Sequence, residues 1–332
     1  DGVFIRRVAL SPHQSGMLDQ SRAFISFARA SCSMVRGEKY DLVFASSSRL
    51  MTASLGAWIA WNKKTLLYLD IRDIFVDAIV DVLRPSLAAL VSPVFGILER
   101  WTIRRAQKVN LVSGGFREYF ETRYTSQLFS YFTNGIDDEF LAAAKVHDTH
   151  EKQERPLLAV YAGNLGEGQG LHLILPELAK RTSGRVHFKI FGDGGKKNQL
   201  LKALEMFSVT NVDIYHPVTR NRLIEEYGKA DILFLHLNNF DAFKKVLPSK
   251  VFEYGAMGKP IWAGVQGYSA DFIRTEIDNA AVFPPCDAAA AVTALSELTT
   301  KTRPRPSFVK KYSRAKICQS MAADIIKTVN EG

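Results

Sequence analysis

The sequence predicts an α/β protein with two doubly wound, parallel-sheet domains. Short apolar and β-branched runs alternate with longer segments of helical periodicity, which is the pattern of parallel strands connected by helices. The chain has 332 residues, of which 47% are hydrophobic and 23% charged, and this suffices for two cores of roughly 150 residues each. The runs form two series, and a polar segment without an apolar face, Ala144 to Pro156, separates them.

The apolar runs give the order of the expected strands. These cover residues 42–45, 66–69, 109–112, 157–161, 186–191, 212–215, 232–235 and 261–263. Residues 1–10 also look like a strand. Ligands of open parallel sheets bind beyond the carboxyl ends of the strands, so the residues directly after each run are the candidates for a site.

Composition argues against several classes of protein. Cys32, Cys286 and Cys318 have neither a CxxC nor a zinc-ligand spacing, and we expect them to be reduced core residues of a cytoplasmic protein. The isolated histidines show no metal spacing either. The longest uncharged apolar stretch, Pro85 to Leu98, is shorter than the roughly 18 to 20 residues of a membrane span, so no transmembrane helix is expected. The chain lacks an initiator methionine and a signal peptide, and we expect N-terminal residues to be missing from it.

Basic residues gather in two places, and the net charge is +9. Residues 301–316 contain basic side chains and no acidic one. A second stripe, formed by Arg100, Arg104 and Lys108 with Arg105 beside it, follows the apolar segment 87–98 and suits an anionic membrane surface. A buried helix that ends in a solvated basic turn is the alternative. No basic motif is interleaved with aromatic residues, so nucleic acid is not an expected partner.

A glycine-rich loop, Gly163 to Gly170, lies between the expected strand 157–161 and a helix. Glycines let backbone amides approach a phosphate at the start of a helix. Gly166 and Gly168, with Asp193 after the next strand, also allow a dinucleotide site, although the third glycine is mis-spaced. A tight strand-to-helix turn without a ligand is the simpler alternative.

A more specific motif is Pro248-Ser249-Lys250-Val251-Phe252-Glu253-Tyr254, followed by Gly258-Lys259-Pro260. Its first two residues start a short helix, and the glycine and second proline end it. Lys250 and Glu253 share one face of this helix. The helix N-terminus and Lys250 could hold a diphosphate, and the Glu253 carboxylate could accept two hydrogen bonds from a ribose diol. A lysine–glutamate pair on the surface is the alternative.

This motif resembles the donor-site motif of family 4 retaining glycosyltransferases, notably those of bacterial O-antigen and capsule assembly. The other stretches that agree with the order of that family are Tyr40-Asp41-Leu42-Val43, Asp70-Ile71-Arg72-Asp73, Glu99 to Ala106, Val112-Ser113, Asn134-Gly135-Ile136-Asp137 and Phe191-Gly192-Asp193-Gly194. The resemblance is strongest from Gly163 to Pro260 and weakest before Tyr40, where the first strand of the family would be expected. It implies the GT-B fold, in which two Rossmann-like domains face a central cleft.

The resemblance also implies a domain division and an activity. An acceptor-side domain of residues 1–143, lacking its first strand, would precede a nucleotide-sugar domain of residues 155–305, and a helix in residues 308–332 would cross back onto the first domain. The enzyme would transfer a hexose from a nucleoside diphosphate sugar, most simply a UDP-sugar, to a lipid-linked saccharide or polysaccharide precursor. It would retain the anomeric configuration and need neither a metal nor another cofactor. We expect it in the cytoplasm, peripheral to the inner face of the cell membrane.

The donor would bind mainly to the second domain. The base would lie near residues 216–218, the ribose at Glu253, and the phosphates at the glycine-rich loop and at the start of the helix after Ser249. The expected donor-binding residues are therefore Gly163, Asn164, Gly166, Gln169, Gly192, Asp193, His216, Val218, Pro248, Ser249, Lys250 and Glu253.

The sequence departs from the family at two positions of the donor site. Family members commonly carry an arginine and a lysine that clamp the phosphates where this chain has Asn164 and Gln169, so positive charge must come from elsewhere. The candidates are Lys244, Lys245 and Lys250. The first of the family's two glutamates would fall at Lys245, and the loop 238–243 is the expected substitute for its contact with the sugar.

In the first domain, Asp70, Arg72 and Asp73 follow a strand and face the expected cleft. A retaining transfer builds negative charge on the departing diphosphate, so the protein mainly stabilises that charge and positions the acceptor. Asp70 or Asp73 would orient the acceptor hydroxyl or take its proton. With Lys250 and Glu253, these are the expected catalytic residues. An Arg–Asp pair that fixes the loop is an equal alternative.

Three other functions stay open from the sequence. The missing clamp at Asn164 and Gln169 is compatible with a catalytically weak subunit that binds a partner or lipid. An epimerase of nucleotide sugars could share the architecture, and a nicotinamide enzyme could use Asp193.

Overall fold

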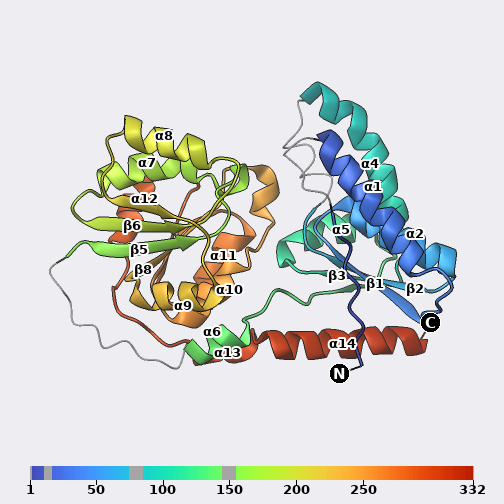
Figure 1. The fold of residues 1–332 in the computed structure, drawn as a ribbon. Helices are drawn as coiled ribbons and strands as arrows, with labels where there is room; N and C mark the ends of the chain where they lie inside the picture. The colour runs from blue at the N-terminus through green and yellow to red at the C-terminus, as the bar shows by residue number, and fades with distance from the viewer. Residues whose placement is uncertain (1, 11–16, 75–84, 144–154, 332) are drawn as a thin grey trace.

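The computed structural model describes residues 2–10, 17–74, 85–143 and 155–331. The described chain forms two lobes, each built on a parallel sheet with helices on its faces (Figure 1). This arrangement confirms the predicted α/β fold class with two doubly wound domains.

The first domain is a four-stranded parallel sheet in the order β1-β2-β3-β4. Its strands are β1 (Leu42–Ser47), β2 (Leu66–Ile71), β3 (Lys108–Leu111) and β4 (Phe129–Ser130). Its helices are α1 (Met17–Met34), α2 (Leu50–Lys63), α4 (Pro85–Arg105) and α5 (Arg117–Arg123), with a 3-10 turn at Gly114–Phe116. The expected strand within residues 1–10 is wrong. Residues 2–10 pair with no strand, and Val3, Phe4 and Ile5 are exposed instead of packed.

Small residues bring helix α2 close to the first sheet. Ala53, Ala57 and Ala60 are fully buried on one face of α2. A Cβ at Gly56 would lie 2.5 Å from the Cβ of Ala45 in β1, so only glycine permits this approach. The close packing fixes the position of the β1 and β2 ends, where the polar residues of the first domain lie.

The second domain is a six-stranded parallel sheet in the order β10-β9-β8-β5-β6-β7. Its strands are β5 (Leu157–Ala162), β6 (Val186–Phe191), β7 (Val212–Tyr215), β8 (Ile232–His236), β9 (Ile261–Gly264) and β10 (Ala280–Phe283). Its helices are α7 (Leu171–Arg181), α8 (Lys197–Met206), α9 (Arg220–Lys229), α10 (Lys250–Met257), α11 (Tyr268–Glu276) and α12 (Ala288–Leu295), with 3-10 turns at Glu167–Gln169 and Asp241–Lys244. The chain reverses direction across the sheet between β5 and β8, which is where sheets of this order bind ligands.

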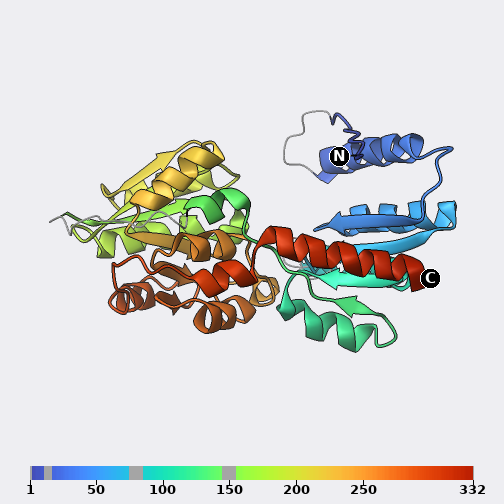
Figure 2. The same ribbon diagram turned by 90° about the horizontal axis from the view of Figure 1, so that it is seen from below.

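Two crossings of the chain connect the domains. Helix α6 (Asp138–Ala143) packs on the second domain through Phe140, although it ends the segment 1–143 expected as the first domain. After α13 (Pro306–Lys311), helix α14 (Arg314–Glu331) returns along the first domain (Figures 1 and 2). There Asp324 accepts hydrogen bonds from Tyr68 Oη (2.8 Å) and Lys108 Nζ (2.5 Å).

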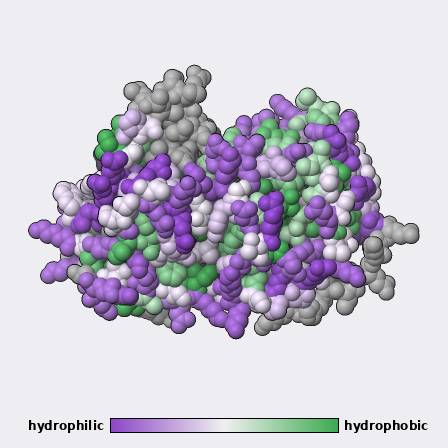
Figure 3. All heavy atoms as spheres, turned by 180° about the vertical axis from the view of Figure 1, so that it is seen from behind, coloured by the Kyte–Doolittle hydropathy of each residue, from purple (hydrophilic) through white to green (hydrophobic). Residues whose placement is uncertain are grey.

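The two crossings are hydrogen-bonded to each other. The backbone N–H of Ile136 donates to the carbonyl of Tyr312 (2.8 Å), and that of Arg314 donates to the carbonyl of Ile136 (2.9 Å). A Cβ at Gly135 would lie 2.6 Å from the Cα of Arg314, so the two crossing segments of the chain are in close contact. On the face shown in Figure 3, hydrophilic side chains predominate over both lobes.

Candidate functional site

A cavity of about 370 Å³ lies at the carboxyl ends of β5 and β6 in the second domain. Residues from both strand ends, from α9 and from the start of α10 surround it. The lining residues are Ala162, Gly163, Asn164, Phe191, Gly192, Asp193, Pro217, Val218, Leu223, Tyr227, Lys250 and Glu253. Its position at the point where the sheet order reverses is typical of a nucleotide site.

Glycines form the floor of this cavity because the backbones approach each other too closely for a side chain. A Cβ at Gly192 would lie 2.0 Å from the carbonyl oxygen of Gly163. A Cβ at Gly163 would lie 2.3 Å from Lys250 Nζ. The lysine ammonium therefore rests directly against the β5 backbone, 5.5 Å from the centre of the Tyr161 ring.

Helix α10 places Lys250 and Glu253 in the cavity and anchors itself by its other face. Val251, Phe252 and Tyr254 are buried in the core of the second domain. Phe252 contacts three further aromatic rings there, so the orientation of α10 is fixed. The Ser249 side chain makes no capping hydrogen bond, and the N–H groups of Val251 and Phe252 donate to the carbonyls of Pro248 (3.1 Å) and Ser249 (3.0 Å).

Burial shifts the pKa values of the two charged residues in opposite directions. It lowers the pKa of Lys250, while the nearby Glu253 charge opposes that shift. It raises the pKa of Glu253, and the positive charges of Lys250 and Arg220 oppose this shift. Asp137 raises the Glu253 pKa further. Burial therefore disfavours both charged forms, which is typical of groups at functional sites.

An apolar surface lies at the β6 end of the cavity. The Phe191 ring stacks on Tyr215 with centroids 5.0 Å apart, and Pro217 and Val218 continue this side. The neighbouring His216 is exposed and does not line the cavity. A flat base would fit against this surface, close to the region that the sequence indicated.

The glycine-rich loop is held by contacts among its own side chains. Asn164 lines the cavity, and its Nδ2 donates to Gln169 Oε1 (3.1 Å). A Cβ at Gly166 would lie 2.6 Å from Asn164 Nδ2, so the Asn164 amide packs directly against this glycine. Gln169 thus positions Asn164 and does not reach the cavity. The expected donor residues that the structure leaves outside its lining are Gly166, Gln169, His216, Pro248 and Ser249.

Other residues of the lining were not predicted from the sequence. These are Ala162, Phe191, Leu223 and Tyr227. Leu223 and Tyr227 lie one turn apart on α9, and in the sequence they have the spacing of ordinary core residues. The structure shows that they face the cavity, because it places α9 beside β5.

The other two lysines proposed to replace the phosphate clamp have different contacts. Lys244 Nζ pairs with Asp241 (2.6 Å). Lys245 Nζ lies 5.3 Å from the centre of the Tyr119 ring in the first domain. Neither lines the cavity, whereas Lys250 does. The loop 238–243, the expected substitute for a sugar contact, also lies outside the lining.

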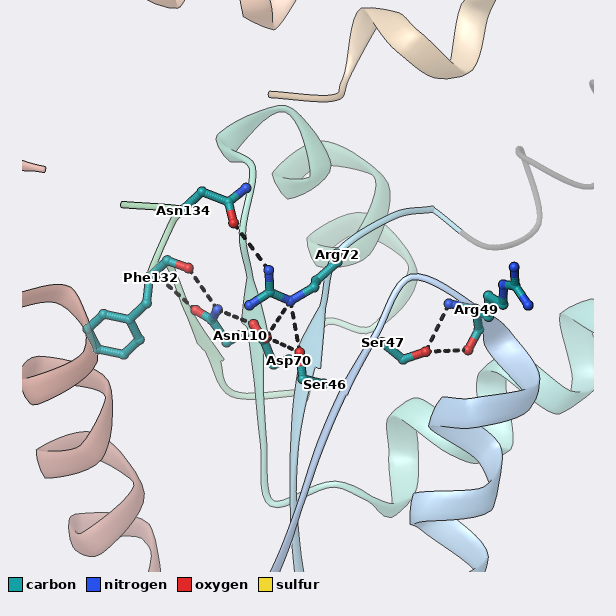
Figure 4. A network of polar contacts seen from close by, with 8 residues as sticks. All are labelled: Ser46, Ser47, Arg49, Asp70, Arg72, Asn110, Phe132 and Asn134. Carbon is teal, nitrogen blue, oxygen red and sulfur yellow. Dashed lines mark hydrogen bonds and ion pairs between the residues drawn. The ribbon is translucent and has the colours of Figure 1, made fainter. Parts of the chain in front are cut away.

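Polar residues of the first domain gather at the carboxyl ends of β1, β2 and β3 (Figure 4). Asp70 is fully buried, and its carboxylate accepts hydrogen bonds from Asn110 Nδ2 (2.7 Å) and Ser46 Oγ (2.6 Å). Arg72 Nε donates to the same carboxylate (3.0 Å). Asp70 has no exposed surface, so its expected role as a proton acceptor stays a prediction. The alternative, an Arg–Asp pair that fixes the loop, agrees with the structure.

Asp73 lies beside this cluster and accepts a hydrogen bond from the N–H of Ile74 (2.9 Å).

The contacts of His236 agree with the structural role expected for the isolated histidines. His236 accepts from the N–H of Cys286 (2.9 Å) and donates to the carbonyl of Gln169 (2.7 Å), and burial lowers its pKa to about 4. The expectation of a core position is wrong for Cys318, which is exposed.

A second cavity, of about 320 Å³, lies between the two domains. The first domain contributes the end of β3 and the second contributes α11. Its lining residues are Leu111, Val112, Gly114, Arg117, Tyr131, Thr133, Leu247, Tyr268, Phe272 and Tyr312. Nearby, Ser113 Oγ donates to the carbonyl of Lys245 (2.6 Å), so the domains contact each other at this point.

Two facing α/β domains with a cavity at the reversal point of one sheet define the GT-B architecture of sugar transferases. The family model described as glycosyl transferases group 1 matches residues 143–316, and one described as a glycosyl transferase 4-like domain matches residues 1–127. The chain therefore belongs to the group 1 glycosyl transferases, and it is a glycosyltransferase of the GT-B fold. A search of curated proteins found no match.

Solved structures agree with this fold. Sucrose-phosphate synthase from Thermosynechococcus elongatus is 14% identical, with a TM-score of 0.74 over 98% of this chain and 83% of that one. Anabaena HepE in complex with UDP-glucose is 14% identical, with a TM-score of 0.67 over 94% and 84%. A UDP-forming α,α-trehalose-phosphate synthase from Burkholderia xenovorans, in complex with glucose-6-phosphate, is 11% identical, with a TM-score of 0.68 over 95% and 79%. At these identities the likeness concerns the fold.

The pKa of Glu253 tests the electrostatics of the cavity. We expect its carboxyl to titrate above 4.5 in the ligand-free protein, because burial disfavours the carboxylate. Lys250→Met should raise this pKa further, since it removes the cation that opposes the burial effect. Carbon-13 NMR titration of labelled glutamate side chains measures both, with Glu253→Gln to assign the signal. A Glu253 pKa below 4.5, or one that Lys250→Met leaves unchanged, would contradict the described site.

Proposed function

We propose that the protein transfers a hexose from a UDP-sugar to a lipid-linked saccharide or polysaccharide precursor, with retention of configuration and without a metal ion. The observation that carries the proposal is the joint exposure of Lys250 and Glu253 to one cavity, against the Gly163 and Gly192 backbones. Among the residues that the structure describes, no three side chains of His, Cys, Asp or Glu gather as a metal site.

Each part of the donor has a matching part of the cavity. The Glu253 carboxylate accepts two hydrogen bonds from the ribose hydroxyls. Lys250 faces the diphosphate from the first turn of α10, where its charge and the helix dipole act in the same direction. The base lies on the surface formed by Phe191, Pro217 and Val218. Two proteins of similar fold support UDP as the nucleotide: HepE, which was solved with UDP-glucose, and the UDP-forming trehalose-phosphate synthase.

The transfer breaks the bond between the anomeric carbon and the diphosphate oxygen, and forms one to the acceptor oxygen. Negative charge grows on the diphosphate, and Lys250 stabilises it in a partly buried site. Asp70 is buried and already accepts three hydrogen bonds, and in this proposal the departing diphosphate itself takes the proton of the acceptor hydroxyl. The acceptor binds from the side of the interdomain cavity, whose aromatic residues Tyr131, Tyr268, Phe272 and Tyr312 suit the faces of sugar rings.

A second candidate function is a catalytically weak subunit that binds a partner or lipid. The observation that favours it is the hydrogen bond between Asn164 and Gln169, which leaves this loop without a cation at the phosphate position. Such a subunit would bind neither UDP nor GDP in a calorimetric titration, whereas the transferase binds the nucleotide of its donor.

Substitution at α10 tests the proposed function. Glu253→Ala should weaken UDP binding by roughly 100-fold, because it removes two charge-assisted hydrogen bonds to the ribose. Lys250→Ala should reduce UDP release from the preferred donor by about 100-fold or more, because it removes the cation facing the leaving group. Calorimetry and a UDP-release assay over a panel of UDP- and GDP-sugars measure these effects.

The control for these variants is Glu205→Ala, an exposed glutamate on α8. It should bind UDP and release it as the unmodified protein does. Normal UDP affinity in Glu253→Ala, with a folded protein by circular dichroism, would remove the basis of the proposal.

Helix α4 carries the surface that we propose to contact the membrane. Within the described residues no helix is both long and apolar enough to cross a bilayer. Val94 and Ile97 are 64% and 71% exposed, and Trp101 continues their face with Arg100 and Arg104 alongside. Exposed apolar and aromatic side chains beside arginines favour the interface of an anionic membrane. Lys108 is not part of this surface, because it lies in β3 and pairs with Asp324.

Vesicle sedimentation tests this surface. Ile97→Glu should lower binding to phosphatidylglycerol-containing vesicles about tenfold, since it removes apolar contact and adds a charge that anionic lipid repels. The matched control is Met206→Glu, which changes an apolar residue of the second domain that is 81% exposed, and it should bind normally. Equal binding of Ile97→Glu and the unmodified protein would contradict a role for α4.

A further inference from the structure

The end of β2 carries an arginine whose inner edge is fixed by buried hydrogen bonds. Arg72 Nε donates to Asp70 Oδ2 (3.0 Å) and to Ser46 Oγ (2.8 Å). Its Nη1 donates to Asn134 Oδ1 (3.2 Å). The Asp70 side chain is 1% exposed, whereas the Arg72 side chain is 42% exposed. The guanidinium is thus held at one side and open at the other.

The carboxylate that holds Arg72 is itself rigid. Asp70 accepts from Asn110 Nδ2 (2.7 Å) and from Ser46 Oγ (2.6 Å). The Asn110 amide is fixed in turn, because its Nδ2 donates to the carbonyl of Phe132 (2.9 Å) and its Oδ1 accepts from the N–H of Phe132 (2.6 Å). Three strands of the sheet therefore determine the direction of the guanidinium (Figure 4).

The contacts use only part of the hydrogen-bonding capacity of Arg72. Its Nε and one Nη1 hydrogen are engaged, and within the described parts of the chain Nη2 has no partner. Asp70 also accepts hydrogen bonds from Asn110 and Ser46, so Arg72 balances the charge of this carboxylate through Nε alone. An arginine that served only to neutralise Asp70 would not need an exposed, fixed outer edge. Such an edge matches the paired oxygens of a phosphate.

We propose that Arg72 binds a phosphate group of a substrate from the side of the first domain. This inference rests on the proposed function, because both substrates of that transfer carry phosphate: the diphosphate of the donor and the phosphate of a lipid-linked acceptor. Asp70, Ser46 and Asn134 act as positioning residues for the guanidinium. Arg49, exposed at the end of the neighbouring strand β1, adds positive charge to the same edge of the sheet.

A phosphate-binding arginine here would also supply charge that the donor loop lacks. Asn164 and Gln169 bond to each other and bring no cation to the cavity of the second domain, where Lys250 is the lysine in the lining. A fixed guanidinium on the opposing domain can neutralise phosphate oxygens that this single lysine leaves exposed. Because the guanidinium is pre-oriented, little side-chain entropy is lost on binding.

Two probes separate the possible sources of the phosphate. UDP represents the donor, and butyl diphosphate, added at saturating UDP, represents an acceptor diphosphate without a nucleoside. The variants are Arg72→Lys, which keeps the charge and loses the planar fork, and Arg72→Ala. Arg185→Ala, an exposed arginine at the amino end of β6, is the matched control. Calorimetry gives the dissociation constants, and thermal unfolding shows that each variant is folded.

We expect both Arg72 variants to bind one of the probes about tenfold more weakly or worse, while Arg185→Ala binds normally. Loss of butyl diphosphate binding with normal UDP binding identifies an acceptor phosphate. Loss of UDP binding identifies the donor diphosphate. Unchanged affinity for both probes in folded Arg72→Lys overturns the inference.

The same titrations separate this inference from the proposed function. If the unmodified protein binds butyl diphosphate through Arg72 and fails to bind UDP, the phosphate site stands and the UDP-sugar transferase does not. If UDP binds and neither probe responds to Arg72, the transferase stands and the phosphate site is overturned. Failure of the unmodified protein to bind either probe overturns both.

Discussion

The burial of Lys250 and Glu253 beside the Gly163 backbone is the constraint on which the site depends. Partly removing an ammonium and a carboxylate from water disfavours both charged forms, and each charge opposes the pKa shift of the other. The aromatic packing of Phe252 keeps α10 in place while its charged face stays in the cavity. A ligand with a diphosphate and a diol would satisfy both groups at once.

The connection between the domains links this constraint to the first domain. Asn134 contacts Arg72 at the end of β2, and three residues later Asp137 pairs with Arg220 (2.8 Å) and with Arg314 at the start of α14. Both of these arginines lower the pKa of Glu253, whereas Asp137 raises it. The crossing segment 134–137 therefore contacts the polar cluster around Arg72 in the first domain and also shifts the pKa of Glu253 in the second.

Much of the fold could be predicted because parallel strands leave a strong local signal. All eight expected apolar runs are strands, whereas the two-residue β4 and the short β10 were missed. The segment 2–10 was misjudged because an apolar run shows strand propensity without showing whether a partner strand exists. The group 1 family membership confirms the glycosyltransferase assignment, and the finer donor, acceptor and stereochemistry stay proposals.

The candidate site was only partly predictable from the sequence. Lys250 and Glu253 could be predicted because their spacing on one short helix is a local feature of the sequence. Leu223 and Tyr227 were not, since they resemble core residues until the sheet order places α9 beside β5. The burial of Asp70 was not predictable either, because it depends on Asn110 and Ser46 from other strands, and the motif around Asp70 does not show it.

The most direct test of the central claim is a crystal structure of the protein with UDP. We predict both ribose hydroxyls within hydrogen-bonding distance of the Glu253 carboxylate, roughly 2.5 to 3.0 Å, and the diphosphate in contact with Lys250. UDP bound at a distance from α10, or with its ribose turned away from Glu253, would contradict the account.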